Sequence, residues 1–292
     1  MTSLCYVNGR VTPESEAVVP IMDRGFLFGD GIYEVITTRG GRFFCMAPHL
    51  ARLRRSAGRL GIGVPLGDDE LVEICRSLRD RAGNADSYAR IILTRGTGTA
   101  PSIDLVHAPA EPNLVIILRP LQEPPEDLMT KGLSAWVVDT CRNDRRSLDP
   151  AIKSGNYLNN ILGLMEARRH GADTALFLNT QGQLAEAPTA NLWLVRDGCM
   201  RTPALASGIL AGITRGLLLE IGRREGLPME EAELAQEDLA AAQEIFLSST
   251  TMPVAPVTEL GGRAVGNGRP GPMSLDLAAR FERYADELMG VS

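Results

Sequence analysis

Lysine is almost absent from this sequence. Among its 30 Lys and Arg residues, only Lys131 and Lys153 are lysines, so arginine supplies nearly all of the positive charge. A lysine amine can lose its proton and form a Schiff base with a carbonyl carbon, whereas an arginine guanidinium stays protonated. Lys153, within the segment 151–160, is therefore a candidate nucleophile. The simpler interpretation is that both lysines are solvated surface charges.

Aromatic residues are also scarce, and the net charge is negative. Aromatics make up 5% of the chain and the formal net charge is -6, which argues against a nucleic-acid partner because such proteins present a basic face. The longest aliphatic run, Leu114–Leu118, is far shorter than a membrane span. The N-terminus also lacks the pattern of a secretory signal. We therefore expect neither a nucleic-acid nor a membrane partner.

Several common kinds of site lack their sequence signatures. The five cysteines form no Cys-x-x-Cys pair, which indicates reduced thiols and a cytoplasmic protein. The three histidines show no metal-ligand spacing, so no metal site is expected. Neither lysine stands in a Gly-Lys-Ser/Thr phosphate-binding motif. The segment 266–271 matches G-x-G-x-x-G, but it contains Pro270 and no βαβ pattern follows it, which favours a turn.

Hairpins and helices occur in clusters along the chain. Asn8-Gly9 and Gly40-Gly41 each separate two short strand-like runs. Helical spacing of apolar residues predicts helices over 48–61 and 68–82 in the first half, and over 157–170 in the second. Such clustering indicates an α+β fold with largely antiparallel sheets rather than a doubly wound parallel fold.

Residues 120–127 contain three prolines and three acids between periodic segments. We take this stretch as the start of a linker over 120–130. It would join a small N-terminal α/β domain, 1–119, to a larger domain, 131–292, with a mainly antiparallel, barrel-like sheet core.

The remaining polar pieces suit a phosphorylated aldehyde cofactor. Lys153 supplies an amine, and Arg52 on the first predicted helix could grip a phosphate at two points. The segment 210–215 leads from a loop into a helix, whose N-terminus presents free N–H groups to an anion. The segment 248–251 offers hydroxyls after a buried strand, and Glu186 at a strand end could hold a protonated pyridine nitrogen. Taken singly, each of these is more often an ordinary structural feature.

Together and in this order, these pieces resemble the fold-type IV pyridoxal-phosphate enzymes, which include branched-chain aminotransferases, D-amino-acid aminotransferases and aminodeoxychorismate lyases. The resemblance covers nearly the whole chain. It rests on Asp23-Arg24-Gly25, Gly29-Asp30-Gly31-Ile32-Tyr33-Glu34, His49-Leu50-Ala51-Arg52-Leu53, Ile152-Lys153-Ser154, Glu186 with Asn191, Gly212-Ile213-Thr214-Arg215, and Ser249-Thr250-Thr251 with Pro256-Val257.

The resemblance implies pyridoxal 5'-phosphate as cofactor, a homodimer with active sites near the subunit interface, and Lys153 as the catalytic residue. Lys153 would form the Schiff base and then move a proton between the substrate α-carbon and the cofactor. The cofactor-binding residues would be Arg52, Tyr157, Glu186, Ile213, Thr214, Ser249 and Thr250, and the substrate-pocket residues Tyr33, Arg95, Thr97 and Thr251.

The motifs differ in how well they match each member of the family. Lys153-Ser154-x-Asn156 and Tyr33-Glu34-Val35 are similar to D-amino-acid aminotransferases, but Ala100 and Ser102 stand where those enzymes carry an Arg-x-His trap for the substrate carboxylate. A Glu-Gly pair, common in branched-chain enzymes, is replaced by Glu34-Val35. We therefore expect a ping-pong aminotransferase that acts on branched-chain or D-amino acids and a 2-oxo acid. The alternatives are an aminodeoxychorismate lyase on the same fold and a non-catalytic cofactor-binding protein.

Overall fold

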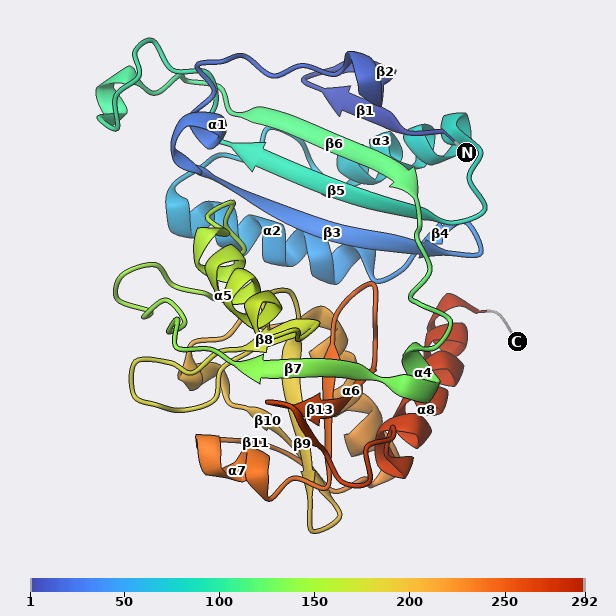
Figure 1. The fold of residues 1–292 in the computed structure, drawn as a ribbon. Coiled ribbons are helices and arrows are strands. Elements are labelled where there is room, and N and C mark those ends of the chain that lie inside the picture. Colours follow the sequence, from blue (N-terminus) through green and yellow to red (C-terminus); the bar gives the residue numbers. More distant parts are fainter. Residues whose placement is uncertain (1, 291–292) are drawn as a thin grey trace. The chain divides into compact units, whose positions relative to one another are not determined.

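The computed structural model describes residues 2–290 (Figure 1). They form two compact units. The first contains the chain up to Gln122 together with Ile152–Asn156, and the second contains Glu123–Ala151 and the chain from Tyr157 onward. The division after Gln122 falls inside the predicted linker 120–130. The segment that carries Lys153 belongs to the first unit, whereas the sequence-based division assigns it to the second.

The first unit is an antiparallel sheet with helices against one face (Figure 1). The strand order is β2-β1-β6-β5-β3-β4. The predicted Asn8-Gly9 hairpin is present, and both residues have positive φ, 45° and 93°. The elements are β1 (Leu4–Val7), β2 (Arg10–Pro13), α1 (Arg24–Phe28), β3 (Gly31–Arg39), β4 (Arg42–Phe43), α2 (Met46–Leu60), α3 (Asp68–Ala82), β5 (Ser87–Thr94) and β6 (Asn113–Pro120).

Helices α2 and α3 supply the core of the first unit. Their apolar residues recur at helical spacing, so one stripe of each helix is buried against the sheet. Both helices end where the sequence predicts, because Gly61 and Gly83 adopt the left-handed conformation, with φ of 63° at each. The buried helix residues include Leu50, Leu53, Leu71 and Leu78.

The second unit contains a mixed sheet of order β11-β10-β9-β12-β13-β7-β8, with β14 paired to β13. The pairs β10–β11, β13–β7 and β7–β8 are parallel, and the others are antiparallel. Over residues 2–290 the sheet is open, so its core is not a closed barrel. The elements are α4 (Leu128–Lys131), β7 (Leu133–Val137), α5 (Leu158–Arg169), β8 (Thr174–Leu176), β9 (Asn191–Arg196), β10 (Cys199–Pro203), α6 (Ile213–Glu225), β11 (Met229–Ala232), α7 (Gln236–Ala240), β12 (Glu244–Ser248), β13 (Ala255–Leu260), β14 (Arg263–Ala264) and α8 (Pro272–Met289).

Helix α5 confirms the helix predicted over 157–170, but its apolar face points to solvent. The opposite face of α5, with Asn160, Gly163 and Ala167, is buried instead. Gly163 lies so close to Phe177 that a Cβ there would stand 2.3 Å from the ring. The side chains on the outer face are 47% to 66% exposed: Leu158, Ile161, Leu162 and Met165. No helix within residues 2–290 is long and apolar enough to cross a membrane.

Candidate active site

The segment Ile152–Asn156 lies along the first residues of β3. The Tyr33 amide donates to the Lys153 carbonyl (2.9 Å), and the Gly155 amide donates to the Gly31 carbonyl (2.8 Å). The Lys153 amide in turn donates to the Ser56 hydroxyl on α2 (3.3 Å). The backbone of Lys153 is therefore fixed by both a strand and a helix of the first unit. The other lysine, Lys131, is 75% exposed and pairs with Asp127, as expected of a surface charge.

Two cationic side chains lie against the ring of Tyr33. Lys153 Nζ lies 4.5 Å from the ring centroid, and the guanidinium carbon of Arg90 lies 3.8 Å from it. Both contacts are within the range of cation–π attraction. The structure therefore places the predicted nucleophile beside the predicted pocket residue Tyr33, and it adds Arg90 from the neighbouring strand β5.

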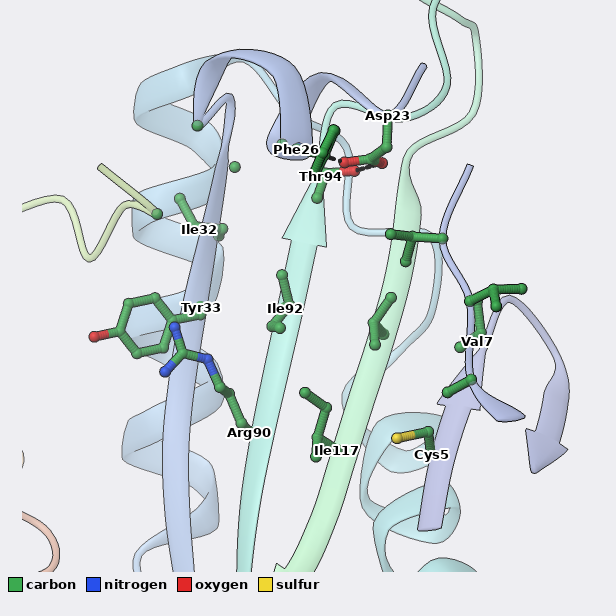
Figure 2. Close-up of a pocket in the computed structure, with 18 of the residues that line it drawn as sticks. Cys5, Val7, Asp23, Phe26, Ile32, Tyr33, Arg90, Ile92, Thr94 and Ile117 are labelled. Atoms are coloured by element: carbon green, nitrogen blue, oxygen red, sulfur yellow. Dashed lines mark hydrogen bonds between the residues drawn. The ribbon is translucent and has the colours of Figure 1, made fainter. Parts of the chain in front are cut away.

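A pocket of about 450 Å³ lies over the face of the first sheet that Tyr33 and Arg90 share (Figure 2). Tyr33 and Arg90 stand at one side of it, and apolar side chains from β5, β6 and β1 extend across it. The segment after β2 contributes further apolar residues. Apolar lining residues include Val7, Val18, Phe26, Ile92, Val115 and Ile117. Such a surface suits an apolar ligand with an anionic group near Arg90.

On the opposite face of β3, Glu34 is completely buried and holds Arg52 at two points. Arg52 Nε donates to Glu34 Oε1 (2.7 Å), Arg52 NH2 donates to Oε2 (2.8 Å), and His49 Nδ1 lies 2.8 Å from Oε2. Burial raises the pKa of Glu34, but the hydrogen bonds from Arg52 and His49 outweigh it and lower this pKa to about 2. Burial also lowers the pKa of His49, against the opposing effect of Glu34. Glu34 thus remains ionised and fixes the orientation of Arg52.

Arg95 and Thr97 lie at the base of the loop between β5 and β6. Arg95 Nε donates to Asp30 (2.7 Å) and Arg95 NH2 to the Leu60 carbonyl (2.9 Å). The hydroxyl of Thr97 accepts from Asn113 (3.0 Å). Both side chains therefore hold the loop to the first unit, and their role in the substrate pocket stays a prediction.

In the second unit, Glu186 is 5% exposed and hydrogen-bonded at both oxygens. Arg142 Nε donates to Oε1 (3.0 Å), while the Leu210 amide (3.0 Å) and Asn191 Nδ2 (3.4 Å) donate to Oε2. A carboxylate held by one cation and two neutral donors is fixed in place. It can still accept a further hydrogen bond, because a carboxylate has about four acceptor positions.

Helix α6 begins beside Asn191. Its N-cap is Gly212, which makes no side-chain cap hydrogen bond, and its first two residues are Ile213 and Thr214. A Cβ on Gly212 would lie 2.0 Å from Asn191 Oδ1, so only glycine permits this approach. Amide groups in the first turn of a helix of 13 residues form a suitable anion site.

The turn after β12 adjoins the same place. Ser248, the last residue of β12, pairs with Asn191 at the start of β9. In the turn, the Ser249 amide donates to the Met252 carbonyl (2.9 Å), and the Met252 amide donates to the Ser249 hydroxyl (3.1 Å). Thr250 and Thr251 are half-buried there. Glu186, the start of α6 and this hydroxyl turn are therefore grouped around Asn191.

Tyr157 occupies the N-cap of α5 and is half-buried. The adjacent asparagines of α5 contact the cation that holds Glu186: Arg142 NH1 donates to Asn159 Oδ1 (2.9 Å) and to Asn160 Oδ1 (3.3 Å). Tyr157 thus begins the helix that supports Arg142, while its contact with a cofactor stays a prediction.

A family model described as amino-transferase class IV matches residues 31–260. The chain belongs to this family. The aminotransferase is 34% identical, over 275 residues, to a D-alanine aminotransferase of Bacillus licheniformis, covering 94% of each chain. It superposes on the branched-chain amino acid aminotransferase of Escherichia coli with a TM-score of 0.91 and 28% identity, covering 96% of this chain and 94% of the other. The branched-chain aminotransferase of the archaeon Thermoproteus uzoniensis, solved with norvaline, gives a TM-score of 0.88 at 29% identity, covering 98% of this chain and 95% of the other.

Class IV aminotransferases depend on pyridoxal 5'-phosphate, and this chain is such a transaminase. Its donor groups are suited to that cofactor. The first unit offers the Lys153 amine, and the second offers the buried Glu186 carboxylate and the N-terminus of α6. The glycine at the N-cap, where a Cβ would collide with Asn191, is consistent with a close approach of an anion to the backbone.

Sequence reasoning did not single out Arg90 or Arg142, and it assigned no role to Glu34 or Asn191. Arg90 could have been noticed, because residues 88, 90 and 92 of a strand share one face, but its placement beside Tyr33 depends on the pairing of β5 with β3. Glu34, Arg142 and Asn191 carry no motif that names their partners. Each of them contacts a residue that the sequence did identify. Glu34 binds Arg52, whereas Arg142 and Asn191 both donate to Glu186.

Proposed function

We propose that this aminotransferase transfers the amino group of an amino acid with an apolar side chain, of the branched-chain or D-amino-acid type, to a 2-oxo acid. The transfer would be a ping-pong reaction through a Schiff base on Lys153. The observation that carries this proposal is the meeting of Lys153, Tyr33 and Arg90 beside an apolar pocket. The branched-chain and D-alanine aminotransferases similar to this chain support the substrate class.

Two parts of the chain would hold the cofactor. Arg52, oriented by Glu34, would bind phosphate together with the amides of Ile213 and Thr214 and the hydroxyls of Ser249 and Thr250. Glu186 would accept a hydrogen bond from the pyridine nitrogen, and Tyr157 would lie near the phenolic oxygen. Bound pyridoxal phosphate supplies an electron sink that makes the α-proton of the attached amino acid acidic.

Lys153 would act as the base. Its amine would accept the α-proton of the substrate and pass it to the cofactor. Tyr33 would limit its movement through the ring contact, and Arg90 would pair with a carboxylate of the substrate. The apolar pocket residues would exclude water from the side chain of the substrate. Arg95, Thr97 and Thr251 remain predicted pocket residues.

We further propose that the enzyme is a homodimer and, from its unpaired cysteines, cytoplasmic. Among the described residues, large apolar side chains are exposed on the outer face of α5, in the segment 18–26, and in the loop between β5 and β6. In that loop Ile103, Leu105 and Val106 are 78%, 62% and 77% exposed. Clustered exposed apolar side chains mark interaction surfaces. Equilibrium sedimentation would test the dimer.

A spectral half-reaction screen tests the proposed function. The purified protein should show a visible absorption band that Lys153→Ala abolishes. Branched-chain amino acids or D-amino acids should convert that band to the amine form, and a 2-oxo acid should restore it. Lys131→Ala is the matched control and should behave as wild type. Pyruvate release from aminodeoxychorismate without an amino acceptor would favour the lyase, and no conversion by any amino acid would indicate a binding protein.

A further inference from the structure

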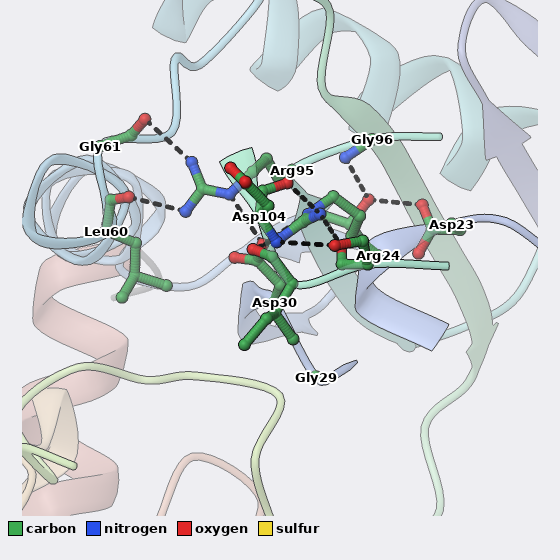
Figure 3. Close-up of polar contacts among 12 residues, drawn as sticks. Asp23, Arg24, Gly29, Asp30, Leu60, Gly61, Arg95, Gly96 and Asp104 are labelled. Carbon is green, nitrogen blue, oxygen red and sulfur yellow. Dashed lines mark hydrogen bonds and ion pairs between the residues drawn. The ribbon is translucent and has the colours of Figure 1, made fainter. Parts of the chain in front are cut away.

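Two arginines far apart in the sequence share one carboxylate oxygen in the first unit (Figure 3). Arg24 Nε and Arg95 Nε donate to Asp30 Oδ2 at 3.0 Å and 2.7 Å. The side chain of Arg24 is 3% exposed, and those of Arg95 and Asp30 are 17% exposed. Burial raises the pKa of Asp30, but the hydrogen bonds from the two arginines outweigh this effect. The net pKa lies below its ordinary value, so the carboxylate stays charged.

Each arginine also holds backbone carbonyls of another segment. Arg24 NH1 and NH2 donate to the carbonyls of Ser102 (2.7 Å) and Ile103 (2.9 Å), in the loop between β5 and β6. Arg95 donates to the Leu60 carbonyl at the end of α2, the helix whose Ser56 accepts from the Lys153 amide. Asp30 thus joins the loop and the helix at one point.

The residues on both sides of Asp30 hold the lysine segment. The Gly29 carbonyl accepts from Asn156 Nδ2 (2.8 Å), and the Gly31 carbonyl accepts from the Gly155 amide (2.8 Å). Neither glycine tolerates a side chain: a Cβ on Gly29 would lie 2.5 Å from Asn156 Oδ1, and one on Gly31 2.8 Å from the Leu93 carbonyl. Of the three residues in this turn, Asp30 alone therefore has a side chain that can anchor it.

We propose that Asp30 is a positioning residue for Lys153 and that Arg24 and Arg95 act through it. The two guanidiniums fix the Asp30 carboxylate, the carboxylate fixes the turn, and the carbonyls of the turn fix the backbone of the lysine segment. Arg24 has a second effect, since it also orders the loop at Ser102 and Ile103. The catalytic consequence rests on the proposed role of Lys153, whereas the effect on the segment does not.

If the ion pairs of Asp30 served only to stabilise the fold, their loss would have a different effect. That loss would loosen the first unit as a whole, lowering the melting temperature and speeding amide exchange in the core strand β5 and in the lysine segment alike. A positioning role predicts local loosening of the turn and the lysine segment, with a fall in kcat rather than a rise in KM.

Asp30→Asn in the full-length protein tests the proposal by amide hydrogen exchange and steady-state kinetics. Exchange in residues 152–156 should speed up by about 10-fold or more, with β5 unchanged. Because small displacements of a catalytic group are costly, kcat should fall by about 10- to 100-fold while KM stays within about 2-fold of wild type. Arg24→Lys should speed exchange in residues 99–107 more than in 152–156.

Arg95→Lys provides a second test of the proposal if Asp30→Asn does not fold. It keeps a charge beside Asp30 but lacks the second N–H group that reaches Leu60, so it should show the same local pattern more weakly. Asp80→Asn, which removes the exposed partner of Arg79 in the same unit, is the matched control and should change neither quantity. Unchanged exchange in residues 152–156 of both variants, or equal acceleration throughout the first unit, would overturn the proposal. Because the exchange pattern needs no turnover, an inactive wild type would count against the proposed function only.

Discussion

The carboxylate of Glu34 and the guanidinium of Arg52 meet in a buried two-point ion pair, with Nε–Oε1 and NH2–Oε2 distances of 2.7 Å and 2.8 Å. Glu34 lies on β3 and Arg52 on α2, so the pair links the strand beside Lys153 to the helix proposed to bind phosphate. Two predictions follow from it.

Glu34→Gln should destabilise the fold and weaken cofactor binding. The variant leaves the Arg52 guanidinium buried without a counter-charge, which typically costs about 3–5 kcal/mol. Urea denaturation of the apoprotein measures the stability, and titration with pyridoxal phosphate measures the affinity. The pair of Arg79 with the exposed Asp80 provides the control, because Asp80→Asn should change neither value. Equal stability of Glu34→Gln and wild type would contradict the prediction.

The same pair should make the protein sensitive to acid. The pKa of Glu34 is lowered from 4.5 to about 2 in the folded protein. A carboxyl group with a lowered folded pKa contributes stability that is complete above its unfolded pKa and is lost as the pH falls toward the folded value. The free energy of unfolding should therefore fall more steeply with decreasing pH between about 5 and 2 in wild type than in Glu34→Gln. The lowered pKa of His49 acts in the same direction from about pH 6.5 downward. Parallel urea titrations over this range would reveal the difference, and identical slopes would refute it.

Gly212→Ala should weaken cofactor binding. The added Cβ would stand 2.0 Å from Asn191 Oδ1, so either the start of α6 or the Asn191 side chain that contacts Glu186 must move. We expect the dissociation constant of pyridoxal phosphate to rise by about 10-fold or more, as for loss of one charge-assisted hydrogen bond. Gly216→Ala is a matched control on the same helix, since a Cβ there meets nothing within 4 Å. That variant should bind normally and gain about 1 kcal/mol in stability.

Arg90→Met should raise the KM for the amino donor. It keeps most of the apolar contact with the Tyr33 ring but removes the cation 3.8 Å from its centroid. Loss of a charged hydrogen bond to a substrate carboxylate corresponds to about 10- to 100-fold in kcat/KM. The absorption spectrum of the bound cofactor should stay unchanged, because Arg90 is not proposed to contact it. Arg119→Met on β6 is the control for the loss of one positive charge, because the Arg119 side chain is 56% exposed. A normal KM in Arg90→Met would exclude Arg90 from substrate binding.

Much of the local structure follows from the sequence by itself. Asn8-Gly9 produces the first hairpin and Gly61 ends α2, because these conformations depend on the residue in place and its immediate neighbours. The family membership also follows, since its motifs lie at fixed positions along the chain. The scarcity of lysine directed attention to Lys153, and the order of the other motifs gave that residue a role.

Tertiary structure alone decided which partners these residues have. Arg90 reaches Tyr33 because β5 pairs with β3 in one register, and Arg142 reaches Glu186 although 44 positions separate them. The apolar stripe of α5 was visible in the sequence, but periodicity shows only that a helix has two faces, and here the face with Gly163 is the buried one. Helical period and turn chemistry act over a few residues, whereas ion pairs and strand register depend on packing between distant segments. The sequence therefore identified Lys153 as the candidate reactive residue, and the fold determined the strand, ring and turn that hold it.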